Sequence, residues 1–113
     1  MKRSAAAAAY AIAIALSPAA GAQDMQAKRL AFIDRLTKQG VFHKLERPAR
    51  LCHLHVGPRF DALSFDDKQG FVNVVYAYCV TERPQEKIVV LKDYRTNKEI
   101  GTYSEAAGGL RLR

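Results

Sequence analysis

The sequence predicts an α+β domain in which a small antiparallel sheet packs against a buried central helix, with a second helix at the N-terminal end. Three observations lead to this fold class. Apolar residues recur with helical spacing over residues 24–39, a long apolar segment at 65–80 begins with helix-capping residues, and the segments between and after them are short and alternating or β-branched. We therefore expect the element order α-β-β-α-β-β.

The N-terminal helix is predicted from a single apolar stripe. Leu30, Ile33 and Leu36 have the spacing that places them on one side of a helix, and Phe32 widens this stripe. Gly40 follows at the position where a left-handed C-terminal cap is expected. The helix should therefore end just before Gly40.

Two short strands are expected next. The first covers residues 41–46 and ends before Pro48, which has no N–H to donate to a sheet. The second covers residues 50–56, where the period of two separates the side chains into two sets. The set expected on the core face is Cys52, Leu54 and Val56, and the opposite set is Leu51, His53 and His55.

The segment 65–80 can be interpreted in two ways. Residues 71–80 are mostly β-branched or aromatic, which favours a buried strand. Ser64 followed by Asp67 resembles a capping box, however, and the whole segment is long for a strand. We expect a central helix, whose buried face would carry Val72, Val75 and Cys79.

A β-hairpin is expected at the C-terminal end. Residues 87–94 contain a β-branched run that is too short for a helix, and residues 95–98 are typical of a turn. Residues 99–104 then form the returning strand. Residues 110–112 are the candidate for a last short edge strand.

Cys52 and Cys79 are the only cysteines in the chain. If the first lies on the core face of its strand and the second on the buried side of the helix, the two meet between the layers. We expect a disulfide that stabilises the fold by about 3 to 4 kcal/mol. Two buried free thiols are the alternative.

The first residues have the three parts of a secretory signal peptide. Lys2 and Arg3 are positive, an apolar run extends from Ala5 to Leu16, and small residues continue to Ala22, after which we expect cleavage. The apolar run is too short to span the roughly 30 Å of a bilayer's hydrocarbon core. We therefore expect no membrane span and a periplasmic or secreted protein.

Two regions follow from this cleavage site: a signal peptide at 1–22 and a single small domain at 23–113. Loss of the signal peptide lowers the formal net charge from +7 to +5. A basic excess favours an envelope protein or an anionic envelope surface as the partner, and no nucleic acid is expected for an exported chain. The basic residues are dispersed, so an ordinary solvated surface is the alternative interpretation.

The candidate chemical groups are few. His53 and His55 are candidates for a metal site because they lie two positions apart on a strand. The alternative is that both side chains line the solvent face of this strand. A closed site usually needs three or four ligands, and Cys52 faces the other way, so we expect neither a metal nor another cofactor. We find no catalytic motif, and Asp66 with Asp67 fits a helix N-terminus better than an acid–base pair. An enzyme is therefore not expected.

A contact surface is predicted on the C-terminal hairpin. Tyr94, Arg95 and Tyr103 are of residue types that are frequent at protein interfaces. We expect these three side chains to form one exposed patch.

Five segments of the chain carry a resemblance to known proteins: residues 39–42, 56–63, 66–69, 74–78 and 96–101. Together they resemble a group of small exported bacterial proteins of unknown function. The resemblance implies a tryptophan where this chain has His55 and a tyrosine where it has Cys79, so a disulfide would be peculiar to this member. It implies no activity, substrate or catalytic residue.

These observations together lead to an expected function class. A small, exported, disulfide-bonded chain without a catalytic motif is expected to be a non-enzymatic binding or accessory module. A histidine-based metal-binding protein and a small enzyme or enzyme inhibitor are the alternatives.

Overall fold

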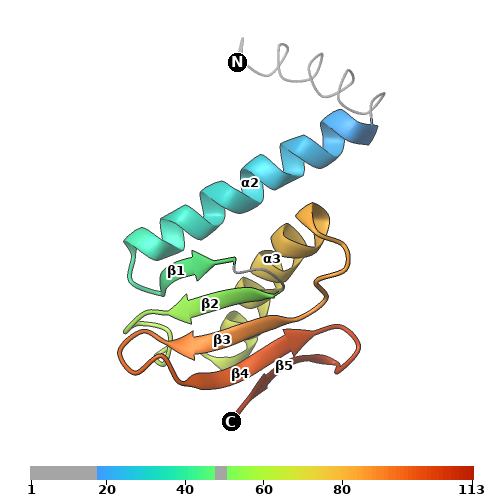
Figure 1. The fold of residues 1–113 in the computed structure, drawn as a ribbon. Coiled ribbons are helices and arrows are strands. Elements are labelled where there is room, and N and C mark those ends of the chain that lie inside the picture. Colours follow the sequence, from blue (N-terminus) through green and yellow to red (C-terminus); the bar gives the residue numbers. More distant parts are fainter. Residues whose placement is uncertain (1–17, 48–50) are drawn as a thin grey trace.

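A computed structural model describes residues 18–47 and 51–113 and has two helices and a five-stranded sheet (Figure 1). The helices are α2 (Pro18–Lys38) and α3 (Phe65–Glu82). The strands are β1 (Phe42–Glu46), β2 (Cys52–Val56), β3 (Val89–Asp93), β4 (Glu99–Ser104) and β5 (Gly109–Leu112). The α+β class is confirmed, and the chain follows the predicted order with β5 added at its end.

The predicted signal peptide lies mostly outside the described residues. Residues 1–17 are not described, and residues 18–22 form the beginning of α2. Signal-peptide cleavage after Ala22 therefore stays a prediction. In the described part of the chain, neither helix combines the length and apolar character needed to cross a membrane.

The sheet is mixed, so the prediction of an antiparallel sheet is wrong in one place. Neighbouring strands follow chain order, and β1–β2, β3–β4 and β4–β5 are antiparallel, but β2 and β3 are parallel. The reason is the connection: α3 carries the chain back along the sheet, so β3 starts at the same end as β2. A strand, a helix and an adjacent strand thus form a βαβ unit inside the sheet.

The segment after Ser64 is a helix, as the capping residues indicated. The Ser64 side chain accepts a hydrogen bond from the Asp67 backbone N–H at 3.1 Å, and Asp66 and Asp67 lie in the first turn. The β-branched and aromatic residues that favoured a strand are there because much of this helix is buried. Its buried residues are Val72, Val75, Tyr76 and Cys79.

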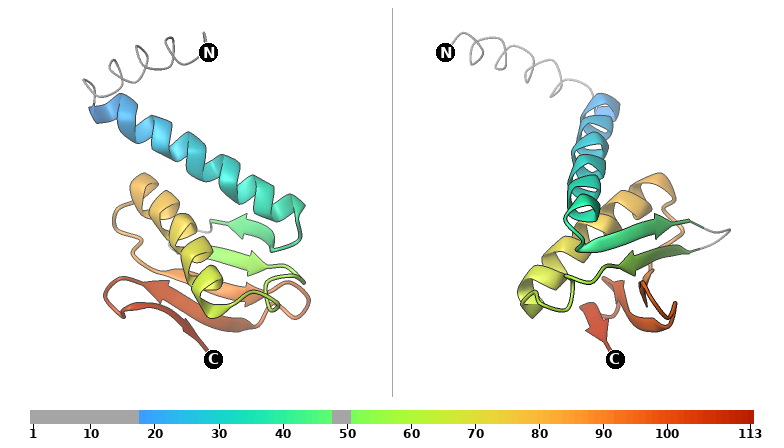
Figure 2. Two further views of the ribbon diagram at one scale, coloured as in Figure 1. Left: turned by 180° about the vertical axis from the view of Figure 1, so that it is seen from behind. Right: turned by 90° about the vertical axis from the view of Figure 1, so that its left-hand side faces the viewer.

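The core lies between α3 and one face of the sheet. Figure 2 shows α3 against this face and no described helix against the other. Cys52, Leu54 and Val56 of β2 are in the core, as the alternation predicted. The Cys52–Cys79 disulfide is confirmed; its Cα atoms are 6.4 Å apart and both residues are fully buried.

Helix α2 packs on the edge of this core. Ile33 and Leu36 are buried, and the Phe32 ring meets the Phe71 ring edge-on at 5.5 Å between centroids. Leu30 is 42% exposed, so the predicted stripe is buried only toward the C-terminal end of the helix. Gly40 has φ 81° and allows the sharp turn from α2 into β1.

Candidate functional site

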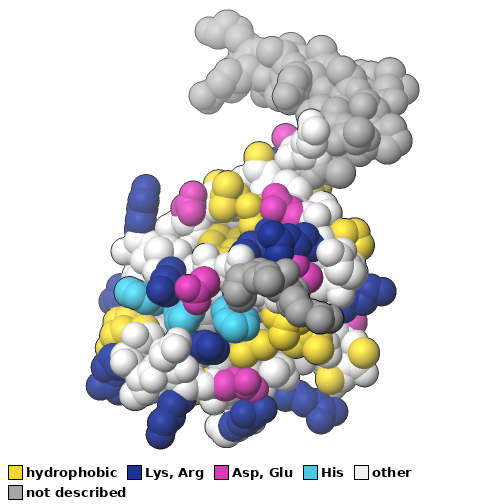
Figure 3. Space-filling view, in the orientation of Figure 1, with side chains coloured by type: hydrophobic (Ala, Val, Ile, Leu, Met, Phe, Trp, Pro, Cys, Tyr) yellow, Lys and Arg dark blue, Asp and Glu magenta, His cyan; other side chains and the backbone are white. Residues whose placement is uncertain are grey.

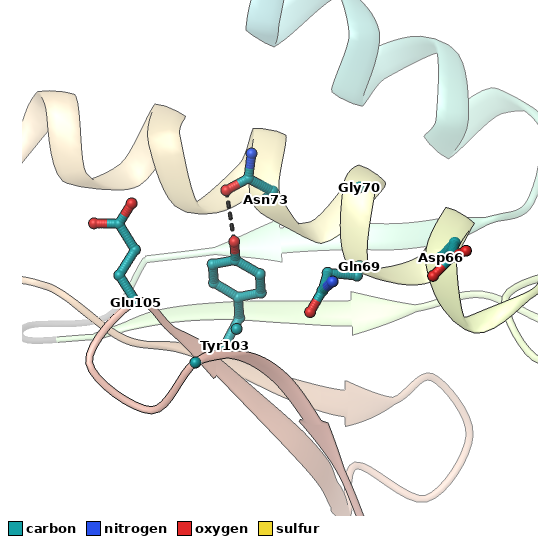
Figure 4. A pocket seen from close by; sticks show the side chains of 8 residues that line it. Asp66, Gln69, Gly70, Asn73, Tyr103 and Glu105 are labelled. Carbon is teal, nitrogen blue, oxygen red and sulfur yellow. Dashed lines mark hydrogen bonds between the residues drawn. The ribbon is translucent and has the colours of Figure 1, made fainter.

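A polar groove of about 690 Å³ lies between the N-terminal half of α3 and the β4–β5 hairpin (Figure 4). We call it the α3–hairpin groove. Its lining combines two carboxylates, two side-chain amides, one phenol and three glycines. Ligand sites are concave and orient their ligands with a few placed polar groups, and here glycines stand where such sites usually have apolar side chains.

Helix α3 supplies one wall of the α3–hairpin groove. Asp66, Gln69, Gly70 and Asn73 are spaced so that they lie along one side of the helix. The opposite side of α3 carries the buried apolar residues. The helix is therefore amphipathic in its first half, and its polar side faces the groove.

The β4–β5 hairpin supplies the other wall with Tyr103, Glu105, Gly108 and Gly109. Both glycines have positive φ, 87° and 112°, which side chains disfavour. A Cβ at Gly109 would also lie 2.5 Å from the Gln69 Oε1. Gly109 thus allows the hairpin turn to approach the helix closely.

Two hydrogen bonds join the walls. The Tyr103 hydroxyl donates to the Asn73 Oδ1 at 2.6 Å, and the Leu110 backbone N–H donates to the Gln69 Oε1 at 3.1 Å. Burial, with a smaller contribution from the Glu105 carboxylate, raises the pKa of Tyr103, so its hydroxyl stays a donor at neutral pH. Both amides therefore contact the hairpin through their oxygens, and neither bond uses their N–H groups.

Gly70 gives the groove its depth at the middle of the helical wall. A Cβ at this position would meet no atom within 4 Å. Glycine inside a helix costs about 1 kcal/mol relative to alanine. Neither packing nor backbone conformation requires glycine here. Glycine at this position therefore lowers the stability of the helix with no structural reason for it.

The two candidate metal ligands lie on the helix-free face of the sheet (Figure 3). His55 is 5% exposed, and its Nε2 is 2.9 Å from the Glu46 Oε1. This hydrogen bond is the main reason that the pKa of Glu46 is lowered. His55 is therefore buried beside a carboxylate, whereas the alternation had predicted a solvent-facing side chain.

His53 lies on the same face, half-buried, opposite Glu46 of β1 and Val90 of β3. Burial, followed by the charge of Lys92, lowers the pKa of His53. Among the described residues, no three histidine, cysteine or acidic side chains converge as a metal site would require.

The predicted patch of Tyr94, Arg95 and Tyr103 is not brought together. Tyr103 pairs with Val89 at the start of β3 and is 7% exposed, whereas Tyr94 and Arg95 lie in the turn after β3. The Arg95 guanidinium lies over the Tyr94 ring at 5.6 Å from its centroid. Tyr103 belongs to the groove, and the other two residues form a separate corner.

Sequence reasoning did not identify most of the groove. Asp66, Gln69, Gly70 and Asn73 have the spacing of one side of a helix, and this pattern was available in the sequence. Glu105 and the turn glycines gave no such indication, because only the path of the hairpin brings them to α3. Comparison with family models, curated proteins and solved structures found no match to this chain.

Proposed function

We propose that this chain is an exported, non-enzymatic binding module that holds its ligand in the α3–hairpin groove. The observation that carries the proposal is the polar lining of that groove, with an open space at Gly70, on the side of α3 that faces the hairpin. Small-molecule and peptide sites have this combination of a concavity and a few oriented polar groups.

The scaffold around the groove suits a binding role. The Cys52–Cys79 disulfide fixes α3 to β2. The hydrophobic core between α3 and the sheet fixes the same helix to the other strands. A rigid wall reduces the entropy lost when a ligand binds. Export is supported by the predicted signal peptide, and a disulfide is compatible with an oxidising compartment.

The arrangement of the carboxylates favours binding over catalysis. Figure 4 shows Asp66 and Glu105 at opposite ends of the groove, with Gln69 and Tyr103 between them. Acid–base catalysis by two carboxylates needs both groups at one reacting bond. These two acids are placed to contact different parts of one ligand.

The partner is proposed to come from the cell envelope. The mature chain keeps a formal charge of +5. On the helix-free face the strand register places Lys44, Lys92 and Arg111 with His53 and His55, and it places Glu46 and Glu99 there too, so this face has a small excess of positive charge. That face is suited to an anionic envelope surface. The groove would then hold its ligand while the basic face lies against the envelope.

The test is an NMR titration of isotope-labelled protein, residues 23–113, with fractionated periplasmic extract. We expect selective shifts of backbone amides at 66–73 and 103–109. Gly70→Leu fills the open space at the helical wall and replaces glycine by a good helix former. The variant should therefore stay folded and lose these shifts. Ala62→Leu adds the same bulk at an exposed loop position and should keep them.

Each outcome decides the proposal. Shifts in the groove that Gly70→Leu abolishes and Ala62→Leu preserves support it. Shifts confined to the helix-free face, or turnover of an envelope substrate that a groove variant abolishes, would overturn the non-enzymatic groove-binding role. Retention of zinc or copper after dialysis would favour the histidine-based alternative instead.

A further inference from the structure

We infer that the ligand of the α3–hairpin groove is an extended, basic peptide segment of three to four residues. This inference rests on the proposed groove function and adds the class of ligand. It follows from the charge of the lining, the amide donors that the hairpin does not use and the length of the lining beside the helix.

The groove is acidic in a basic protein. Its lining contains Asp66 and Glu105 and no lysine, arginine or histidine, although the whole chain has a formal net charge of +7. The neighbouring Lys68 is not a lining residue, and its Nζ lies over the Phe60 ring at 5.5 Å from the centroid. The local charge therefore favours ammonium or guanidinium groups, one at each end of the groove.

The middle of the groove offers the complementary chemistry. The oxygens of Gln69 and Asn73 already accept hydrogen bonds from the hairpin, so their amide N–H groups are the ones available for a ligand. Backbone carbonyls of an extended peptide are acceptors at regular intervals. A basic residue at each end with peptide carbonyls between them matches this order of groups.

The length of the groove fits a short peptide. From Asp66 to Asn73 the helix rises about 10 Å at 1.5 Å per residue. An extended chain covers this distance in about three residues. Gly70 lies between these two positions and leaves space at the helix surface, which lets a peptide backbone approach the wall.

The probe is a capped tetrapeptide with lysine at both ends and two glycines between, titrated into the folded 23–113 protein by calorimetry and NMR. We expect saturable binding with shifts confined to 66–73 and 103–109. Replacing the two lysines of the probe by glutamates should abolish binding. Raising the salt concentration from about 20 mM to about 500 mM should weaken it, because exposed ion pairs are screened.

Matched variants locate the charges. Asp66→Asn and Glu105→Gln should each weaken binding about three- to fivefold, the value of an exposed ion pair. Asp67→Asn removes the same charge from the same helical turn but lies outside the groove lining, so affinity should not change. Equal loss from Asp66→Asn and Asp67→Asn would reveal a general charge effect and overturn the assignment.

The remaining outcomes separate this inference from the proposed function. Binding of spermidine as tightly as the peptide would overturn the peptide assignment, since spermidine carries the charges without carbonyls. Absence of saturation by about 5 mM peptide would overturn the ligand class, because even weak specific complexes are detectable there. A neutral oligosaccharide from the extract that shifted the same amides would overturn the ligand class and leave the groove function intact.

Discussion

The two halves of helix α3 are held in different ways. The C-terminal half is fixed by covalent and ionic contacts: Cys79 is bonded to Cys52, and the Glu82 Oε1 is 2.8 Å from the Arg47 Nη1. The N-terminal half contributes Val72 to the core and contacts the hairpin through the Tyr103 and Gln69 hydrogen bonds, and its polar side borders the open groove. One helix therefore serves as a scaffold at one end and as a binding wall at the other.

This difference follows from the topology. The C-terminal half of α3 ends beside β1 and the loop into β3, where strands and loops meet. The N-terminal half is joined to β4 and β5 by the Asn73–Tyr103 and Gln69–Leu110 hydrogen bonds, and the groove lies between them. The contacts at the C-terminal half of α3 hold the helix on the sheet, so its N-terminal half can border an open groove while the core stays packed.

The largest expected effect is loss of the disulfide. A Cys52→Ala and Cys79→Ala double variant should lose about 3.5 kcal/mol of unfolding free energy on the chain-entropy model, because the bridge closes a loop with a sequence separation of 27 residues. Denaturant titration measures this loss, and the reduced native protein is its control. Amide exchange should accelerate more at 75–82 than at 66–73; an equal acceleration would contradict the two-part view of α3.

The second effect concerns Glu86, which is 3% exposed between two arginines. Its Oε2 is 2.8 Å from the Arg83 Nη1, and its Oε1 is 3.6 Å from the Arg47 Nη2. Within the described residues, the Arg47 Nε, the Arg47 Nη2 and the Glu86 Oε1 have no hydrogen-bond partner, so the ion pair between Glu86 and Arg47 offsets part of the cost of their burial. Glu86→Gln should cost about 2 kcal/mol, less than a fully buried pair because both arginines are partly exposed.

A matched variant tests the role of burial in this network. Glu82 pairs with the same Arg47, but its side chain is 44% exposed. Glu82→Gln should therefore cost less than about 1 kcal/mol in the same denaturant titration. If the two glutamine variants were equally destabilised, burial of Glu86 would not be the source of the larger effect.

The sequence was sufficient for the parts of the fold that depend on local patterns. The capping residues at Ser64 and Asp67 identified α3 against a strong β-propensity, and the alternation of β2 placed Cys52 on the core face. The parallel pairing of β2 and β3 was missed, because strand direction depends on where α3 returns the chain. His55 was expected to face solvent, since alternation gives the face of a side chain and not what covers it.

The candidate site was harder to predict for the same reason. Tyr103 was identified as a contact residue, but it was grouped with Tyr94, which lies at the other end of the hairpin. Its neighbours in the groove are Asn73 and Glu105. An asparagine or a glutamate alone in a sequence does not indicate a binding site. Long-range packing, which a single sequence does not display, brings these three together.

The third prediction is a gain in stability, whereas the variants above lose stability. Gly70→Ala should stabilise the protein by about 1 kcal/mol, because alanine is the better helix former and its methyl group meets no atom. The melting temperature should rise by about 5 °C for a domain of this size. Ala77→Gly, in the tightly held half of the same helix, should lower it by a similar amount. A fall in stability for Gly70→Ala would mean that the groove wall is packed more closely than the structure indicates.

The smallest effect is expected from Tyr103→Phe. This change removes the hydrogen bond to Asn73 but keeps the ring, whose centroid is 5.1 Å from that of Tyr76. Water in the groove can replace the lost partner, so the cost at neutral pH should be about 0.5 kcal/mol, the low end for a hydrogen bond. Denaturant titration of the variant beside the native protein measures it.

The pH dependence of the same pair of proteins then isolates the Tyr103 hydroxyl. Burial raises its pKa above the ordinary value of 10.0, so the unfolded chain loses this proton first as the pH rises. The native protein should therefore lose stability above pH 10.0, and Tyr103→Phe should lose less. Part of the slope should persist in the variant, because burial also raises the pKa of Tyr78 in the tightly held half of α3. Parallel curves for the two proteins would place the Tyr103 hydroxyl in solvent and remove it from the groove wall.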